Sequence, residues 1–435
     1  MTTPFERNLK FLGRTIIFPA LWILYFILSF RVLSRLPVGI VMEVFEIAFL
    51  ALLLSACAFE FFRSLLAKKV NYLFLIFLPL AVLPLVNAIQ ASKVFGQPLL
   101  YGFASQRQMF MFLGAYFIVF ALVRGWVTLK NLERYFLYGI MSILFIMLFF
   151  YIFINPGMFA GTDFVQNSAS KGWLYQFPNG VAVGIIFYSL IKIWREDNYI
   201  YYIHLMLAVI YFILFAQDRS QIAFIGLTAG ILFLKDLNLQ RKIIYLFYSC
   251  FLLIFAAIVL VSVKPDIFAK YEQLYVNATA IITGANPHES STQVRFYESA
   301  IGWRGLQQHP LLGVGFLSAQ WNDGYLGRYG YFYPADIGLL GNLYVYGFLG
   351  TLCFYIPIIA GLRWGWQMRK LREPFLLTVF YSLLFMTFDM FTAASNIKFI
   401  GPPTFCIGVI YYYRFYIFKK WKAEMKGETL QPSTS

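Results

Sequence analysis

The chain is poor in charge. Only 13% of its 435 residues are Asp, Glu, Lys or Arg, and 60% are hydrophobic. In an ordinary soluble domain about a quarter of the residues are charged. The few charges are also unbalanced, with 35 basic and 20 acidic side chains and a formal net charge of +15. This composition argues against an ordinary water-soluble domain.

Cysteines and metal-binding motifs are scarce as well. The sequence has no HExxH, no paired Cys-x-x-Cys and no Asp-x-Asp cluster in its expected external segments. Gly313-x-Gly315 is too short to predict nucleotide binding. We therefore expect no metal and no other cofactor. The cysteines all fall in apolar stretches, so they indicate small core residues and no disulfide framework: Cys57, Cys250, Cys353 and Cys406.

Long apolar runs are what the sequence has in abundance. A helix that crosses a bilayer needs about 20 mostly apolar residues. Strands of a closed barrel would instead alternate over about ten residues, whereas these runs are apolar on all sides, so helices are expected. The predicted fold is an all-α polytopic membrane protein with about twelve transmembrane helices in one membrane domain, 1–435. The apolar stretches lie near 15–31, 38–62, 71–91, 109–127, 135–154, 178–194, 199–217, 220–234, 243–263, 337–362, 375–393 and 399–418.

The basic residues predict an orientation. Segments on one side of the expected membrane hold 23 of the 35 lysines and arginines. The positive-inside rule places that side, with both termini, in the cytoplasm. Segment 264–336 is then a large external loop. The positive charge therefore indicates topology and contact with anionic lipids. Because it is spread over seven loops and not gathered on one face, it does not predict a nucleic-acid partner.

Three acidic residues lie inside expected spans: Glu43, Glu46 and Asp389. Glu43 and Glu46 share a helical face, either as a polar packing pair or as part of a cavity, and both interpretations stay open. Charge deep in the bundle is what a transporter of lipid-linked sugars would need. No internal repeat is visible, which argues against a transporter built from two related halves.

The external loop is the only long polar stretch and has its own pattern. An amphipathic helix is expected over 266–283, and a second helix begins near 290–292 and ends before Pro310. Segment 322–334 carries four tyrosines, whose apolar rings and wet hydroxyls suit a membrane interface. Charge gathered beside a membrane in this way indicates a functional region.

The helix 292–308 separates its charged residues into two faces. At 100° per residue, Arg295, Glu298, Gly302 and the position of His309 fall within about 60° of each other, with Arg304 about 180° away. We expect Arg295 to face the protein. The alternative is a surface ion pair between Arg295 and Glu298, worth a fraction of a kcal/mol. For His309, the alternative to a role in binding is a plain helix end before Pro310.

Two more charged residues stand at the ends of expected spans. Arg219, in Asp218-Arg219-Ser220, is either part of a capped turn with an internal Asp–Arg pair or a guanidinium aimed at phosphate, which its planar fork binds bidentately. Asp336 directly precedes an apolar span. It is either the N-cap of that helix or a base beside the membrane.

These residues resemble the O-antigen ligase and polymerase superfamily of bacterial inner-membrane glycosyltransferases. Arg295, Trp303 and the run H-P-L-L-G-V-G at 309–315 are similar to the family pattern R…W…PLLGVG, and Arg219 resembles a family arginine at the external end of a central span. Ligases of this family carry His-(Asn/Ser/Gln)-x9-G-x-x-G. Here Asp336 occupies the histidine position and the glycines of 347–350 match, which favours a polymerase over a ligase.

The resemblance implies a GT-C-like fold and a reaction. A polymerase would join polyprenyl-diphosphate-linked repeat units of an O-antigen, capsule or exopolysaccharide at the periplasmic face of the inner membrane. Its partners would be the lipid-linked donor and acceptor, membrane lipids and a chain-length regulator. Arg219 and Arg295 would bind the diphosphate without a metal, with Asp336 as the base. Arg304, His309 and Tyr333 would contact the substrate. The alternatives are a ligase that transfers the glycan to lipid A core and a flippase of lipid-linked sugars.

Overall fold

The structure is a computed structural model. It describes residues 11–29, 39–66, 72–160, 164–168, 172–175, 177, 180–196, 198–216, 219–236, 243, 290–393, 400–418 and 421. The helix expected over 266–283, nearly all of the span expected over 243–263 and the residue Asp218 lie outside these ranges.

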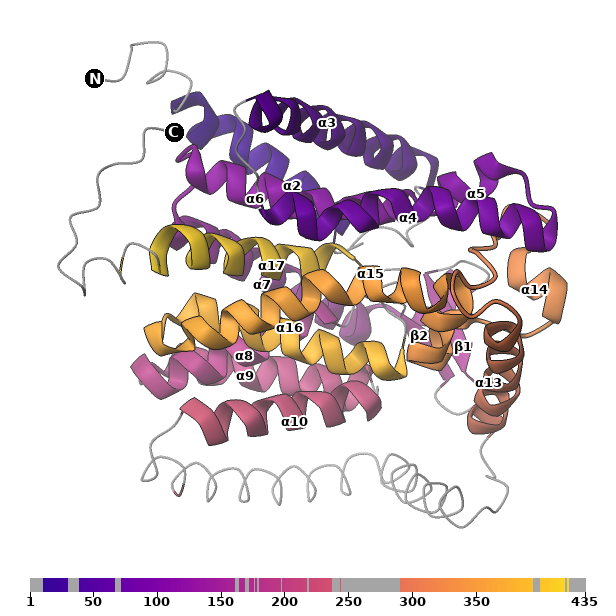
Figure 1. Ribbon diagram of the computed structural model, residues 1–435. Coiled ribbons are helices and arrows are strands. Elements are labelled where there is room, and N and C mark those ends of the chain that lie inside the picture. The colour runs from indigo at the N-terminus through magenta and orange to yellow at the C-terminus, as the bar shows by residue number, and fades with distance from the viewer. Residues whose placement is uncertain are drawn as a thin grey trace.

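Helices form most of the described chain (Figure 1). A single hairpin pairs β1 (Val165–Ser168) with β2 (Gly172–Tyr175) in antiparallel register. Short helical turns also occur, among them η2 (Arg107–Leu113), η5 (Pro334–Ile337) and η8 (Tyr413–Ile417). The α-helices are α2 (Phe18–Ser29), α3 (Gly39–Leu66), α4 (Tyr72–Phe95), α5 (Leu99–Ser105), α6 (Gly114–Val123), α7 (Leu129–Phe153), α8 (Gly180–Glu196), α9 (Tyr199–Ile210), α10 (Arg219–Asp236), α13 (Ser290–Gln308), α14 (Gly324–Tyr329), α15 (Gly338–Met368), α16 (Pro374–Thr392) and α17 (Gly401–Tyr412).

The architecture agrees with an all-α integral membrane protein. Among the described residues, four helices are long and apolar enough to cross a membrane, or five if the bent pair formed by α5 and the segment Arg107–Val123 is one span. Helices also occupy the other expected stretches within the described residues, but twelve crossings and a GT-C-like arrangement stay predictions. The hairpin was not predicted. It packs under α7, where the Tyr175 hydroxyl donates to the carbonyl of Ile154 at 2.9 Å.

Small residues let the helices of the bundle approach closely. A Cβ on Gly408 of α17 would lie 3.0 Å from the backbone of Ala115 in α6, and one on Gly361 of α15 would lie 2.9 Å from Leu383 in α16. In lipid the hydrophobic effect does not drive helices together, so close van der Waals packing of this kind is the main source of association. Aromatic stacking adds to it, as between Phe136 and Phe405, whose ring centroids are 5.1 Å apart.

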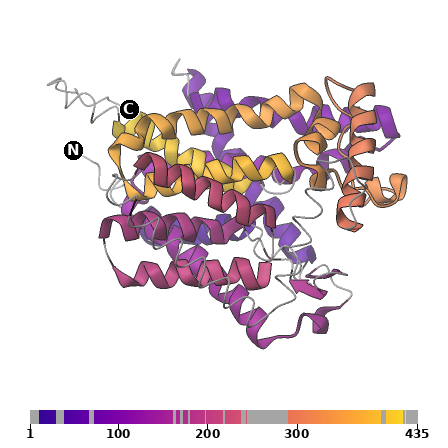
Figure 2. The same cartoon turned by 90° about the horizontal axis from the view of Figure 1, so that it is seen from below.

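Contacts between α10, α15 and α16 show which residues share an end of the bundle. Asp236, the last residue of α10, forms an ion pair with Arg369 just after α15. The Arg369 Nε and the Asp236 Oδ1 are 3.2 Å apart. Near the start of α10, Phe224 stacks on Phe388 near the end of α16, with centroids 6.2 Å apart. The helices α10 and α15 therefore begin at the same end. We call it the α13 end, because α13, α14 and the hairpin gather there (Figures 1 and 2).

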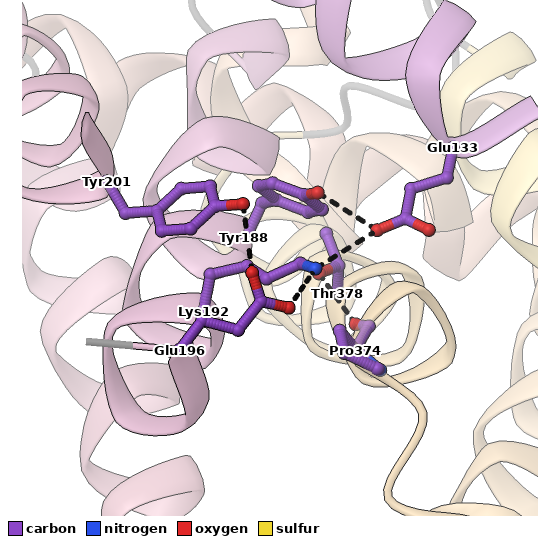
Figure 3. A network of polar contacts seen from close by, with 7 residues as sticks. All are labelled: Glu133, Tyr188, Lys192, Glu196, Tyr201, Pro374 and Thr378. Carbon is purple, nitrogen blue, oxygen red and sulfur yellow. Dashed lines mark hydrogen bonds and ion pairs between the residues drawn. The ribbon is translucent and has the colours of Figure 1, made fainter. Parts of the chain in front are cut away.

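The opposite end, called the Lys192 end, is held by a polar network (Figure 3). The Lys192 ammonium lies 2.5 Å from Glu196 and 3.9 Å from Glu133. Tyr188 donates to Glu133 at 2.9 Å, and Tyr201 donates to Glu196 at 3.1 Å. The network joins α7, α8 and α9, so its charged groups stabilise the packing of these three helices.

Candidate functional site

The helix α13 lies across the α13 end and packs on the first half of α15. Its buried face contains two glycines: a Cβ on Gly302 would lie 2.8 Å from Ile337, and one on Gly305 would overlap the ring of Tyr344. Because glycine removes the side chain at both positions, the backbone of α13 sits directly against α15. The helix predicted over 292–308 is confirmed by α13, Ser290–Gln308.

Glu298 is the charged residue at the centre of this buried face. It is 0% exposed. Its Oε1 accepts the backbone N–H of Tyr333 at 2.8 Å, while Oε2 has no hydrogen-bond partner within the described part of the chain. Burial, helped by the charge of Asp336, raises the pKa of Glu298 above its usual value, and the Tyr333 N–H and Arg295 oppose this only in part. The carboxyl therefore holds a proton more readily than an exposed glutamate.

The segment that follows α14 brings Asp336 and two tyrosines to Glu298. Asp336 lies half-buried in the turn η5, with its N–H bonded to the carbonyl of Tyr333 at 2.9 Å. Tyr331 and Tyr333 are exposed, with their rings edge to face at 5.4 Å. Burial and the charges of Asp336 and Glu298 raise the pKa of both tyrosines. Both phenols are therefore neutral hydrogen-bonding groups beside two carboxyls.

Arg295 belongs to this group but is not oriented as expected. It acts on the pKa values of Glu298 and Tyr331, yet its side chain is exposed, so the expected inward position is wrong. The face that packs inward is centred on Glu298 and Gly302. Nor is there an Arg295–Glu298 ion pair within 4.0 Å in the described chain, because Glu298 is turned toward the Tyr333 backbone. Arg295 instead flanks the carboxyl cluster from the surface of α13.

Arg304 and His309 lie apart from that cluster. Arg304 is exposed, on the opposite face of α13 from Arg295. His309 directly follows the last residue of the helix, with its N–H bonded to the carbonyl of Gly305 at 2.9 Å. At 1.5 Å per residue it lies about 20 Å along the axis from Arg295. The structure therefore groups Arg295 with Asp336 and Tyr333, and places His309 at the other end of α13.

Asp336 is not the N-cap of the following helix. Ile337 occupies the N-cap position of α15 and makes no side-chain capping bond. The chain turns there through Gly338 at φ 57°, where a Cβ would overlap the carbonyl of Phe391 at the end of α16. The N-cap interpretation of Asp336 is therefore wrong, since its carboxylate does not cap α15.

The PLLGVG run, residues 310–315, packs against a break in α15. Gly347 has φ 63° and ψ −173°, which interrupts the helix. The run 310–315 lies alongside the break and bonds its backbone: Val314 N–H donates to Tyr344 O at 2.9 Å, and Phe348 N–H donates to Pro310 O at 2.8 Å. A Cβ on Gly347 would overlap the carbonyl of Leu311. The first glycine of 347–350 is thus needed for this backbone contact, which fixes the position of α13 relative to α15.

A side chain of α4 and one from the loop after it hold this segment from the other side, and sequence reasoning missed both. The amide of Gln90 donates to Gly313 O at 3.0 Å, and that of Gln97 donates to Phe316 O at 3.1 Å. Gln90 lies in α4, whereas Gln97 lies in the short loop after it, so no helical spacing in the sequence linked the two. Tyr325 is buried and donates to Gly315 O at 2.7 Å. Of the four tyrosines expected at an interface, Tyr325 is therefore structural.

Arg219 is the first residue of α10 and lies at the α13 end. Phe224 follows it by five residues and stacks on Phe388. Phe391, one turn further along α16, contacts Gly338. The backbone of Arg219 is therefore at the same end of the bundle as Asp336.

The acidic pair on α3 has a partner that the sequence did not reveal. Arg107, at the start of η2, lies 2.9 Å from Glu43 Oε1 and 3.4 Å from Glu46 Oε2. In the sequence, the available signal for this contact was an arginine between two apolar stretches, together with an acidic pair inside another apolar stretch. This ion-paired group favours the packing interpretation of Glu43 and Glu46. Within the described ranges, no three His, Cys, Asp or Glu side chains gather as a metal site would require.

The comparison with known families addresses the region that carries the site. Residues 204–355 match the family model described as O-antigen ligase. The match includes Arg219, the whole of α13, Asp336 and the glycines of 347–350. A search of curated proteins finds no match. The resemblance of the sequence is thus confirmed: this integral membrane protein carries an O-antigen ligase family region, as expected for a member of the O-antigen ligase and polymerase superfamily.

Proposed function

We propose that the protein is a polysaccharide repeat-unit polymerase of the bacterial inner membrane, with its site at the α13 end, facing the periplasm. Segment 264–336 is then the large external loop of a single membrane domain, 1–435. The observation that carries the proposal is the grouping of Arg295, Glu298 and Asp336 beside exposed tyrosines. Asp336 stands where a ligase of the family would have histidine.

The proposed reaction joins two lipid-linked glycans. The bond between the reducing-end sugar and the diphosphate of the donor breaks, and the sugar forms a glycosidic bond to a hydroxyl of the acceptor. The polyprenyl diphosphate leaves with the electron pair. Because a diphosphate is already a good leaving group, stabilising its charge matters more than protonating it. The guanidinium groups of Arg219 and Arg295 supply that charge bidentately.

The two carboxyls beside Arg295 have different roles in this reaction. Asp336 is half-exposed and accepts the proton of the attacking hydroxyl as general base. Glu298 is buried, and because its pKa is raised it keeps a proton more readily than an exposed glutamate. The exposed rings of Tyr331 and Tyr333 offer flat apolar surfaces against which sugar rings can pack. Arg304 and His309 lie farther along α13 and would meet more distant parts of the glycan.

A glycan ligase is the second candidate, because the family model that matches 204–355 is described as O-antigen ligase. Such an enzyme would use the same donor and would transfer the finished polymer to lipid A core. The same arginines would bind the same diphosphate. The difference lies in the acceptor, which the cluster around Asp336 does not identify.

Deletion of the gene in its host, followed by separation of the glycans by size, tests the proposal. Loss of a polymerase leaves single repeats attached to their final acceptor. Loss of a ligase leaves long polymer on its lipid carrier, and loss of a flippase traps repeats inside the cell. Plasmids that encode Arg219→Ala and Arg295→Ala should fail to restore long chains although the proteins accumulate normally. Long chains with both variants would refute the diphosphate clamp.

A further inference from the structure

An open groove lies between α15 and η8 at the Lys192 end, far from the proposed transfer site. Its volume is about 420 Å³. Ile356 and Ile359 line one part of it, and Arg363, Gln367 and Arg414 line the other. The groove is therefore apolar along one stretch and cationic at its end.

The dimensions of the groove match one leaflet of a bilayer. From Ile356 to Gln367 the helix rises by about 17 Å, close to half of the roughly 30 Å hydrocarbon core. Arg363 follows Asp336 by 27 residues along this helix, so the two lie near opposite membrane surfaces. An acyl chain that runs along Ile359, which is 56% exposed, would place its headgroup at Arg363.

Within the part of the chain that the structure describes, the two arginines of the groove have no acidic partner. Neither Arg363 nor Arg414 forms an ion pair with Asp or Glu within 4.0 Å in the described chain, although the Arg414 guanidinium lies over the ring of Phe418 at 5.3 Å. Arg369, six residues after Arg363, is by contrast paired with Asp236. Two guanidinium groups that converge on a groove without a carboxylate favour an anionic ligand.

Trp364 also lines the groove, next to Arg363, and its ring packs on two further aromatic rings. Trp364 lies edge to face with Tyr411 and with Phe415, at centroid distances of 5.7 and 5.5 Å. Tryptophan and tyrosine concentrate where headgroups meet hydrocarbon. The aromatic residues and the change from apolar to basic lining thus place the membrane boundary at the same level of α15.

We infer that this groove binds an anionic glycerophospholipid. Its phosphate lies between Arg363 and Arg414, with Gln367 as a further hydrogen-bond donor, and one acyl chain follows Ile359 and Ile356. Basic pockets between transmembrane helices recognise anionic headgroups in this way. The inference does not depend on the proposed transferase activity.

Native mass spectrometry of the purified full-length protein, incubated with equal amounts of phosphatidylglycerol and phosphatidylcholine, tests the inference. The wild type should retain more phosphatidylglycerol than phosphatidylcholine. The double variant Arg363→Gln/Arg414→Gln should lose about 30-fold in this preference, since each basic side chain near an anionic headgroup is worth about fivefold. The control Lys235→Gln/Lys370→Gln removes two exposed charges from the same end and should behave as wild type.

Two further arms separate a lipid from a free anion. Ile359→Trp fills the acyl path and should weaken retention of phosphatidylglycerol although both arginines remain. Millimolar inorganic phosphate should not displace the lipid. Equal retention of both lipids by the wild type, unchanged preference in the arginine double variant, or displacement by phosphate alone would each overturn the inference.

Discussion

The two ends of the bundle treat their charged residues differently. At the Lys192 end, Lys192 is shared by two glutamates and Arg369 is bound by Asp236. Lys192 bonds within α8 and to α7, and the Arg369–Asp236 pair joins the end of α15 to α10, so these charges serve the packing of helices. The charges of this network and of the Arg369–Asp236 pair are therefore explained by the fold itself.

At the α13 end the charged side chains lie close together but do not form ion pairs among the described residues. One carboxylate oxygen of Glu298 accepts a hydrogen bond from the backbone of Tyr333, and the other has no partner in the described chain. Arg295 and Asp336 flank it, and neither forms an ion pair within 4.0 Å among the described residues. The fold there is held by backbone contacts at glycines instead. A charge that the fold does not need for its own stability is available to a substrate, which is why we place the reaction at this end.

The largest expected effect concerns stability. Gly347→Ala should lower the free energy of unfolding by more than about 3 kcal/mol, because the conformation is nearly restricted to glycine and the new Cβ overlaps the carbonyl of Leu311. The melting temperature of purified protein in detergent would measure it. The matched control is Gly226→Ala in α10, where a Cβ meets nothing within 4 Å. It should be neutral or slightly stabilising. Equal melting temperatures would disprove the role of the break in α15.

The next largest effect concerns activity. Arg295→Lys keeps the charge but removes the planar fork, so we expect the rate of chain elongation to fall about 100-fold at an unchanged melting temperature. Arg304→Lys, on the opposite face of α13, should cost less than tenfold. The assay is elongation of a lipid-diphosphate-linked repeat by purified protein. A larger loss for Arg304→Lys would reverse the assignment of faces.

A change at the Lys192 end should separate stability from activity. Lys192→Met leaves the partly buried Glu133 and the exposed Glu196 without their cation and should cost about 1–3 kcal/mol of stability. The elongation rate per folded molecule should stay within twofold of the wild type. The comparison between the two ends fails if the variant keeps its melting temperature but loses elongation.

The smallest expected effect is a pH dependence of stability. The pKa of Glu298 is raised in the folded state. The folded protein therefore binds more protons than the unfolded chain between the unfolded pKa and the raised one, and stability falls as pH rises through that window. Glu298→Gln keeps the acceptor for the Tyr333 N–H but cannot ionise, so its melting temperature should lose this part of the pH dependence. Identical pH profiles for the two proteins would show that Glu298 is not protonated in the fold.

Local patterns predicted the elements and part of the site. The apolar runs and the cap and proline around α13 are properties of neighbouring residues, and both were found from the sequence. The three charged positions of the site, Arg219, Arg295 and Asp336, followed from the resemblance and their place beside apolar runs. The structure places Asp336 with Arg295, and the backbone of Arg219 at the same end.

Features that depend on distant partners were not predictable. Helical spacing placed Arg295 and Glu298 on one face, but only the contact between α13 and Tyr333 decides that Glu298 is buried and Arg295 exposed. The break at Gly347 depends on a run more than 30 residues earlier in the chain. Arg107 pairs with an acidic residue 61 positions before it, a separation at which helical periodicity carries no information.

A double-mutant cycle in the elongation assay tests most directly whether Arg219 and Arg295 form one site. The rate is measured for the wild type, Arg219→Ala, Arg295→Ala and the double variant. If both arginines bind the same diphosphate, each single change costs about 100-fold and the double change costs little more, because residues that act as a unit are not additive. Losses that multiply, or single variants that elongate as fast as the wild type, would contradict a joint site at the α13 end.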